Sequence, residues 1–216
     1  MCGIAGWYRR GGAPVERDVV ARQCDRIIHR GPDDAGYFTD GDFGFGMRRL
    51  SIIDLAGGHQ PIFSADGRHA IVFNGEIYNH LDLRRELEAA GYAFQTDHSD
   101  TETVLASWLH WGDDAWLKLD GMYAVAIWNR KERQLVLARD PLGIKPLYLT
   151  EQHGGLAFAS EIRALQVLPN HHFDLDERGV HDFFMLGVIP SRETARVTWN
   201  AGHGHAYLVT MSVTPL

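Results

Sequence analysis

The sequence has few of the features that mark exported, membrane-embedded or nucleic-acid-binding chains. Its 216 residues include only two cysteines, Cys2 and Cys24, too few for a disulfide framework. No apolar run approaches the roughly 18 residues of a membrane span, and no export signal opens the chain. Basic residues are outnumbered, 21 against 28 acidic ones, so nothing attracts nucleic acid or anionic membranes. We expect a cytoplasmic protein with no nucleic-acid or membrane partner.

Patterns that bind metals or nucleotides are also missing. The 12 histidines include no HExxH or Cys/His zinc spacing, and the His171-His172 and His203-Gly204-His205 groups stand alone. The dipeptide Gly-Lys of a phosphate-binding loop is absent, and Gly44-Phe45-Gly46 lacks the third glycine of a dinucleotide fingerprint. We therefore predict no metal site and no cofactor in this chain.

What is present is an ordinary globular composition, 45% hydrophobic and 23% charged, without repeats or linkers. The patterning predicts several hairpins and amphipathic helices, which favours an α+β fold of two stacked sheets flanked by helices. Strands are expected at 2–8, 44–51, 70–73, 76–78, 122–128, 134–138, 146–149 and 156–159. Helices are expected at 16–28, 80–90, 161–167, 177–185 and from Ser99, with a loop at 29–36 and weak patterning after 189.

Three local signals refine these elements. Cys24 falls on the apolar face of the first helix and is expected in the core. Gly91 is placed to cap the second helix. Ser99-Asp100-Thr101-Glu102 has the pattern of a capping box and sets the next helix start near Ser99.

Cys2 is the first candidate for chemistry. The run from Cys2 to Tyr8 is strand-like, so the chain start is expected to be held within a sheet. If Met1 is removed, Cys2 carries both a thiol and a free α-amine, whose reference pKa of about 7.7 to 8.0 leaves part of it neutral at physiological pH. Nucleophile and base then belong to one residue.

Asn74-Gly75 allows two interpretations. The pair is typical of a hairpin turn between two strands. It also provides a side-chain amide and a backbone N–H that can point together, which is how an oxyanion hole is built.

Three charged residues match an amino-acid substrate. Arg48 and Arg49 lie on opposite faces of a strand, so only one can face a site. An α-carboxylate needs a guanidinium and an α-ammonium needs carboxylates, a set that Arg49, Glu76 and Asp100 provide. Each could equally be a surface charge, and Asp100 a part of the capping turn.

Together these residues resemble the amidotransferase domain of the asparagine synthetase family, a class II glutamine amidotransferase of the N-terminal-nucleophile hydrolase group. The resemblance rests on many motifs in the family's order: Cys2-Gly3-Ile4-Ala5-Gly6, His29-Arg30-Gly31-Pro32-Asp33, Arg49-Leu50-Ser51-Ile52-Ile53-Asp54, Phe73-Asn74-Gly75-Glu76-Ile77-Tyr78-Asn79, Ser99-Asp100-Thr101-Glu102, Gly121-Met122-Tyr123-Ala124, the segment 139–148, and Ala159-Ser160-Glu161-Ile162.

The resemblance implies a four-layer αββα sandwich of two mostly antiparallel sheets flanked by helices. We expect one domain over 1–216, with a recognisable core at 2–185 and a weakly patterned segment at 186–216. The site residues it implies are the nucleophile Cys2, the oxyanion donors Asn74 and Gly75, the carboxylate-binding Arg49, the ammonium-binding Glu76 and Asp100, and the backbone of Leu50 and Ile52. Arg30 is expected to orient the loop around the N-terminus, and the segment 139–148 to be structural and outside the site.

The implied function is hydrolysis of glutamine to glutamate and ammonia through a Cys2 thioester, with a synthetase domain or subunit as ammonia acceptor. ATP and magnesium would belong to that synthetase part, whose Ser-Gly-Gly-x-Asp-Ser loop is not found here. We therefore expect a stand-alone module or a fragment of a longer enzyme. The alternatives are a non-catalytic glutamine-binding or regulatory module and another N-terminal-nucleophile amidase with a different substrate.

Overall fold

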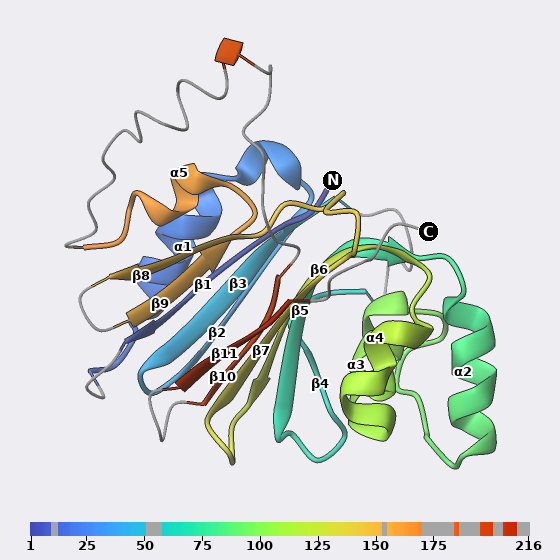
Figure 1. Ribbon diagram of the computed structural model, residues 1–216. Coiled ribbons are helices and arrows are strands. Elements are labelled where there is room, and N and C mark those ends of the chain that lie inside the picture. Colours follow the sequence, from blue (N-terminus) through green and yellow to red (C-terminus); the bar gives the residue numbers. More distant parts are fainter. Residues whose placement is uncertain are drawn as a thin grey trace.

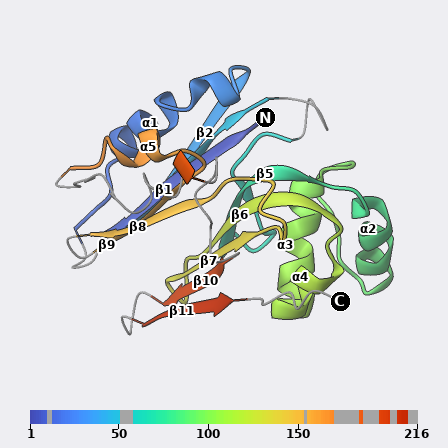
Figure 2. The same cartoon turned by 45° about the horizontal axis from the view of Figure 1, so that its top comes forward.

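Two antiparallel sheets, each with helices on its outer face, make up the computed structural model (Figures 1 and 2). It describes residues 1–9, 13–50, 58–152, 155–169, 184–185, 195–200 and 205–210. The five-stranded sheet has the order β2-β3-β1-β9-β8: Asp34–Asp40, Phe43–Arg49, Gly3–Arg9, Gly155–Ala159 and Tyr148–Gln152. The six-stranded sheet has the order β11-β10-β7-β6-β5-β4: His205–Thr210, Ala195–Asn200, Gln134–Arg139, Gly121–Asn129, His69–Ile77 and Ile62–Phe63.

The helices divide between the two outer faces. α1 (Arg17–Asp25) and α5 (Ile162–Leu165) cover the five-stranded sheet. α3 (Asp100–Trp111) and α4 (Ala115–Lys118) lie on the other side against the six-stranded sheet, and α2 (His80–Ala89) packs against α3. The described residues also include the 3-10 helices η1 (Ile28–Arg30) and η2 (Gly112–Asp114). The order helix, sheet, sheet, helix confirms the α+β four-layer fold expected from the resemblance.

The main core lies between the two sheets. The rings of Phe43 from β3 and Trp128 from β6 stack there with centroids 4.1 Å apart. Alternation along β6 sends Ala124, Ala126 and Trp128 inward, while the residues between them pack against α3 and α4. β6 is therefore buried on both faces, as its uninterrupted apolar run predicts.

Several local predictions are confirmed. Cys24 is fully buried on the inner face of α1, and burial raises the pKa of its thiol to about 12. Gly91 ends α2 with a φ of +94°, and the N–H of Tyr92 bonds the carbonyl of Leu87 at 2.9 Å, which is the Schellman arrangement.

Three local predictions are wrong. Asn74-Gly75 is not a hairpin turn, because β5 runs without interruption from His69 to Ile77 and pairs with β6 along its length. The expected loop at 29–36 instead gives way to β2 at Asp34, where pairing with β3 overrides the weak strand preference of Asp and Gly.

The third error concerns the capping box. α3 does start directly after Ser99, but the Ser99 side chain makes no capping bond. Glu102 turns back to the preceding loop instead, where it accepts hydrogen bonds from the backbone N–H groups of Gln95 and Thr96, both at 2.7 Å. The position of the helix start was predicted correctly, but the hydrogen bonds made by Ser99 and Glu102 were not.

The C-terminal segment adds two strands, β10 and β11, to the edge of the six-stranded sheet, although its patterning is weak. The helix expected at 177–185 lies outside the described residues except for 184 and 185. The single-domain assignment over 1–216 stays a prediction.

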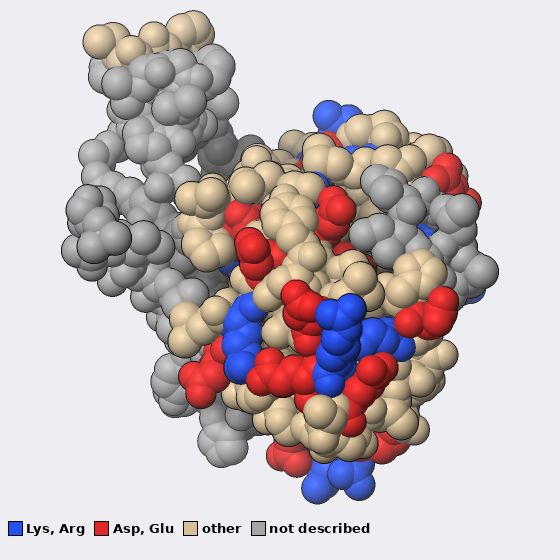
Figure 3. All heavy atoms as spheres, turned by 90° about the vertical axis from the view of Figure 1, so that its right-hand side faces the viewer, with Lys and Arg blue, Asp and Glu red and all other residues tan. Residues whose placement is uncertain are grey.

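Acidic and basic side chains are interspersed on the face formed by α2 and its neighbours (Figure 3). Ion pairs such as Arg85–Asp82 at 2.8 Å and Lys118–Glu86 at 3.0 Å lie on these elements. Among the described residues, no helix is long and apolar enough to cross a membrane.

Candidate active site

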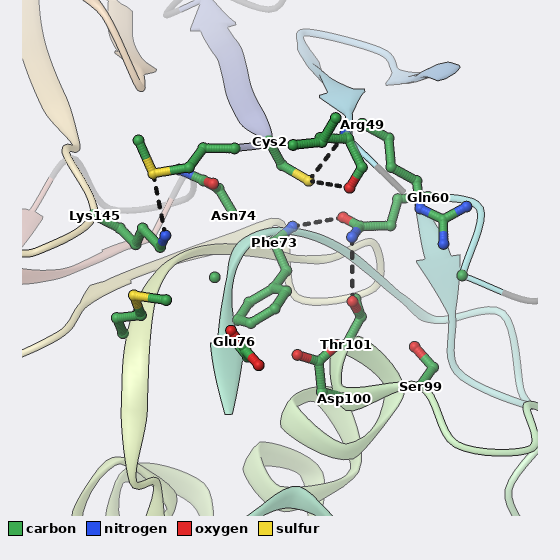
Figure 4. A pocket seen from close by; sticks show the side chains of 15 residues that line it. Cys2, Arg49, Gln60, Phe73, Asn74, Glu76, Ser99, Asp100, Thr101 and Lys145 are labelled. Atoms are coloured by element: carbon green, nitrogen blue, oxygen red, sulfur yellow. Dashed lines mark hydrogen bonds between the residues drawn. The ribbon is translucent and has the colours of Figure 1, made fainter. Parts of the chain in front are cut away.

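One pocket collects nearly all the residues expected at the site (Figure 4). They come from elements far apart in the sequence: the chain start, the end of β3, the middle of β5 and the first turn of α3. The residues brought together are Cys2, Arg49, Leu50, Asn74, Gly75, Glu76 and Asp100. Ile52 lies outside the described residues.

The Cys2 thiol lies against the backbone that follows β3. Its Sγ is 3.4 Å from the N–H of Leu50 and 3.5 Å from the Leu50 carbonyl. On the other side, Arg30 Nε donates a 3.0 Å hydrogen bond to the Cys2 carbonyl, and Arg30 is itself paired with Glu161 at 3.1 Å. These contacts hold the start of β1 from two directions.

Gly3 makes this close packing possible. A Cβ at position 3 would lie 2.9 Å from Ile27 Cδ1 and 3.1 Å from Arg30 Cδ. A larger residue would therefore push Arg30 away from the carbonyl that it binds.

The edge of β5 supplies backbone donors to the pocket. N–H groups two residues apart on a strand point to the same edge. On this edge the N–H of Phe73 bonds Gln60 Oε1 at 2.7 Å and that of Ile77 bonds Asp100 Oδ2 at 3.4 Å. Gly75 lies between them, so its N–H points to the same edge, facing the pocket.

Asn74 adds a side-chain donor beside Gly75. Its side chain is 1% exposed, and Nδ2 has no hydrogen-bond partner among the described residues. An unpaired buried amide is costly and is expected to have a role. Only glycine fits at the next position, because a Cβ on Gly75 would lie 2.4 Å from the Met122 carbonyl oxygen.

Charged groups of both signs surround these donors. Asp100 is 6% exposed, and burial is the main reason why the pKa of its carboxyl is raised, with the nearby charge of Glu76 adding to it. Arg49, also 6% exposed, lines the pocket, whereas Arg48 on the opposite strand face pairs with Asp25 near α1. The predicted division of the two arginines is therefore confirmed.

The pocket also contains residues that sequence reasoning missed. Gln60 and Thr101 contribute side chains that bond each other, and no periodicity or motif singled out Gln60. Lys145, 5% exposed, comes from the segment 139–148 that we expected to lie outside the site, and its Nζ is 3.4 Å from Met1 Sδ. The rest of that segment is structural, since Asp140 accepts the backbone N–H groups of Ile144 and Lys145.

Within the part of the chain that the structure describes, no three His, Cys, Asp or Glu side chains gather to hold a metal ion. What the pocket offers is a thiol, amide donors and charged groups of both signs, a set suited to acyl transfer from an amino-acid amide.

Two stacked antiparallel sheets lie between helices, and Cys2 directly precedes β1, a central strand of the five-stranded sheet. A family model described as "Glutamine amidotransferase domain" matches residues 1–205. The chain belongs to this glutamine amidotransferase family.

The chain is similar to curated glutamine-hydrolysing asparagine synthetases. It is 43% identical over 197 residues to "Asparagine synthetase [glutamine-hydrolyzing] 1" of Bacillus subtilis, covering 90% of this chain and 31% of that one. The corresponding synthetase 3 of the same organism is 39% identical over 196 residues, covering 89% and 31%. The chain thus spans under a third of these relatives' length.

A solved structure supports the fold. The glutamine phosphoribosylpyrophosphate amidotransferase of B. subtilis superimposes with a TM-score of 0.74 at 21% identity, covering 99% of this chain and 50% of that one. At this identity the likeness concerns the fold alone.

Proposed function

We propose that this domain hydrolyses the side-chain amide of glutamine to glutamate and ammonia through a thioester on Cys2. The observation that carries the proposal is the meeting of the Cys2 thiol with the unpaired, buried Asn74 amide in one pocket. A nucleophile and a donor for the developing oxyanion are the two parts that amide cleavage needs most.

The first half-reaction begins with removal of Met1, which frees the α-amine of Cys2. That amine takes the thiol proton, and Sγ attacks the γ-carbonyl carbon of glutamine. Asn74 Nδ2 and the Gly75 N–H donate hydrogen bonds to the oxyanion. The C–N bond of the glutamine amide then breaks. The α-ammonium of Cys2 returns its proton to the leaving nitrogen, and ammonia departs.

The second half-reaction releases the product. The α-amine, neutral again, takes a proton from water, and the hydroxide attacks the thioester carbonyl beside the same donors. Breaking the C–S bond gives glutamate and restores the Cys2 thiol. Both tetrahedral intermediates thus use one base and one oxyanion hole.

The charged groups select the substrate. Arg49 binds the α-carboxylate of glutamine, while Glu76 and Asp100 bind its α-ammonium. Burial raises the pKa of the Asp100 carboxyl, and the positive charge of the bound α-ammonium would offset that desolvation. Leu50 contributes backbone groups to the pocket wall, and Ile52 is proposed to do the same.

The acceptor of the ammonia is proposed to be a synthetase domain or subunit, because the relatives are named as glutamine-hydrolysing asparagine synthetases. ATP and magnesium would act in that synthetase part. Hydrolysis by this chain needs neither, since its proposed nucleophile, base and oxyanion donors are all protein groups.

The test is glutamate release by the purified chain, with removal of Met1 verified by intact mass. We expect turnover without ATP or magnesium, and none with Cys2→Ala, which should still bind glutamine in calorimetry. If the verified wild-type chain binds glutamine but releases no glutamate, the non-catalytic binding module is the correct interpretation. If it cleaves a different amide and does not bind glutamine, the chain is an N-terminal-nucleophile amidase with another substrate.

A further inference from the structure

A buried glutamine connects two walls of the pocket. Gln60 lies just before β4 and is 4% exposed. Its Oε1 accepts a 2.7 Å hydrogen bond from the N–H of Phe73, and its Nε2 donates a 3.1 Å hydrogen bond to Thr101 Oγ1 (Figure 4). One side chain thus joins β5 to α3 across the pocket.

The contact with Phe73 replaces a missing strand. β4 has two residues and pairs only with Ala70 and Ile71 of β5. Beyond them the N–H of Phe73 would be a buried donor without an acceptor, which costs about 1–3 kcal/mol. Gln60 satisfies it and leaves the next N–H on that edge, from Gly75, for the pocket.

The two contacts flank proposed substrate-binding groups. Phe73 directly precedes Asn74, and Thr101 directly follows Asp100. The oxyanion donors and the ammonium-binding carboxylate lie at opposite ends of a bound glutamine. The Gln60 amide therefore fixes the spacing between the groups that hold the two ends of the substrate.

We propose that Gln60 is a positioning residue that holds the oxyanion donors of β5 in register with α3. The inference rests on the proposed function. Because catalysis is sensitive to displacements of about 1 Å, which can cost as much as 10²-fold, a loosened β5 edge should reduce turnover. Initial glutamine binding should change little, since Arg49, Glu76 and Asp100 remain.

The experiment compares four single variants and one double variant by kcat and KM, with kcat expressed per active site titrated with an electrophilic glutamine analogue. Gln60→Met removes both hydrogen bonds while keeping a side chain of similar length. Thr101→Val removes one of them while keeping a side chain of similar shape. Thr101→Ser keeps the hydroxyl. Thr103→Val is the matched control. Thr103 is also buried in α3, but its hydroxyl donates to the Ser99 carbonyl at 3.0 Å, whereas the Thr101 hydroxyl accepts from Gln60 Nε2.

We expect Gln60→Met to lower kcat about tenfold or more, with KM within about threefold of the wild type. Thr101→Val should have a smaller effect of the same kind, which Thr101→Ser restores, and Thr103→Val should leave kcat unchanged. Combining Gln60→Met with Thr101→Val should be no worse than Gln60→Met alone, because Thr101 acts through Gln60.

A wild-type kcat per titrated site in Gln60→Met would overturn the inference. So would equal losses in Thr101→Val and Thr103→Val, which would point to general destabilisation of α3. If Gln60→Met does not fold, the contrast between Thr101→Val and Thr101→Ser decides the matter. Absence of glutaminase activity in the wild type would instead refute the proposed function.

Discussion

Replacing Asn74 with alanine should separate activity from stability. The substitution keeps the Cβ and removes only the amide, whose buried Nδ2 has no hydrogen-bond partner in the described part of the chain. Losing one oxyanion donor typically lowers kcat by about 10² to 10³, or about 2.7–4 kcal/mol of transition-state stabilisation. KM should change little, because the α-carboxylate and α-ammonium contacts remain.

The folded protein should not suffer from the same change. A buried donor without an acceptor costs about 1–3 kcal/mol, so deleting it removes a penalty rather than a bond. We therefore expect the melting temperature of Asn74→Ala to equal or exceed that of the wild type. Activity and stability should move in opposite directions.

Asn79→Ala is the matched control. Both polar atoms of the Asn79 amide are hydrogen-bonded, since Nδ2 donates to the Lys118 carbonyl at 2.9 Å and Oδ1 accepts from the Asp120 N–H at 3.0 Å. Two lost hydrogen bonds at about 1 kcal/mol each should lower the melting temperature and leave kcat intact. Thermal unfolding and steady-state glutamate release measure both variants. A kcat of Asn74→Ala within about threefold of the wild type would refute the oxyanion assignment.

Three further results are expected. Arg49→Ala should mainly raise KM, by about ten- to a hundredfold, because a charge-assisted hydrogen bond contributes about 1.5–3 kcal/mol; a change in kcat alone would contradict this. Asp100→Asn should weaken glutamine binding in calorimetry but raise the melting temperature at pH 7. The pKa of Asp100 is raised in the folded chain, so ionising its carboxyl destabilises the wild type as the pH rises. The higher melting temperature of the variant should therefore vanish below about pH 3.8, the ordinary pKa of the carboxyl. A thiol reagent should label Cys2 in the folded chain and spare Cys24, which is fully buried with its pKa raised to about 12; labelling of Cys24 at a similar rate would contradict the buried assignment.

Much of the fold was predictable because its determinants are local. An uninterrupted apolar run marks β6, and the glycine after α2 marks its end. The predictions were wrong where pairing between segments distant in the sequence determines the secondary structure. β2 and the middle of β5 are strands because they pair with β3 and β6. Asn74-Gly75 has a turn's sequence yet sits within a ladder, which no local pattern reveals.

The site was predictable in part for a similar reason. Its charged and nucleophilic residues have distinctive chemistry, and they were found from that chemistry and from the family resemblance. Gln60 and Lys145 have no local signature, because their place at the pocket depends on how loops fold over the sheet edge. Only the three-dimensional structure shows that Gln60 accepts the Phe73 N–H, which lies beyond the pairing of β5 with β4.

The central claim is that the freed α-amine of Cys2 is the base for its own thiol. The most direct test is to measure glutamate release by one preparation that carries an N-terminal tag joined to Cys2. The measurement is made before and after a protease removes the tag and leaves Cys2 as the first residue. With Cys2 in an amide bond no amine base exists, so we expect no turnover before cleavage and full turnover after it. Equal turnover by the uncleaved, mass-verified protein would contradict the account.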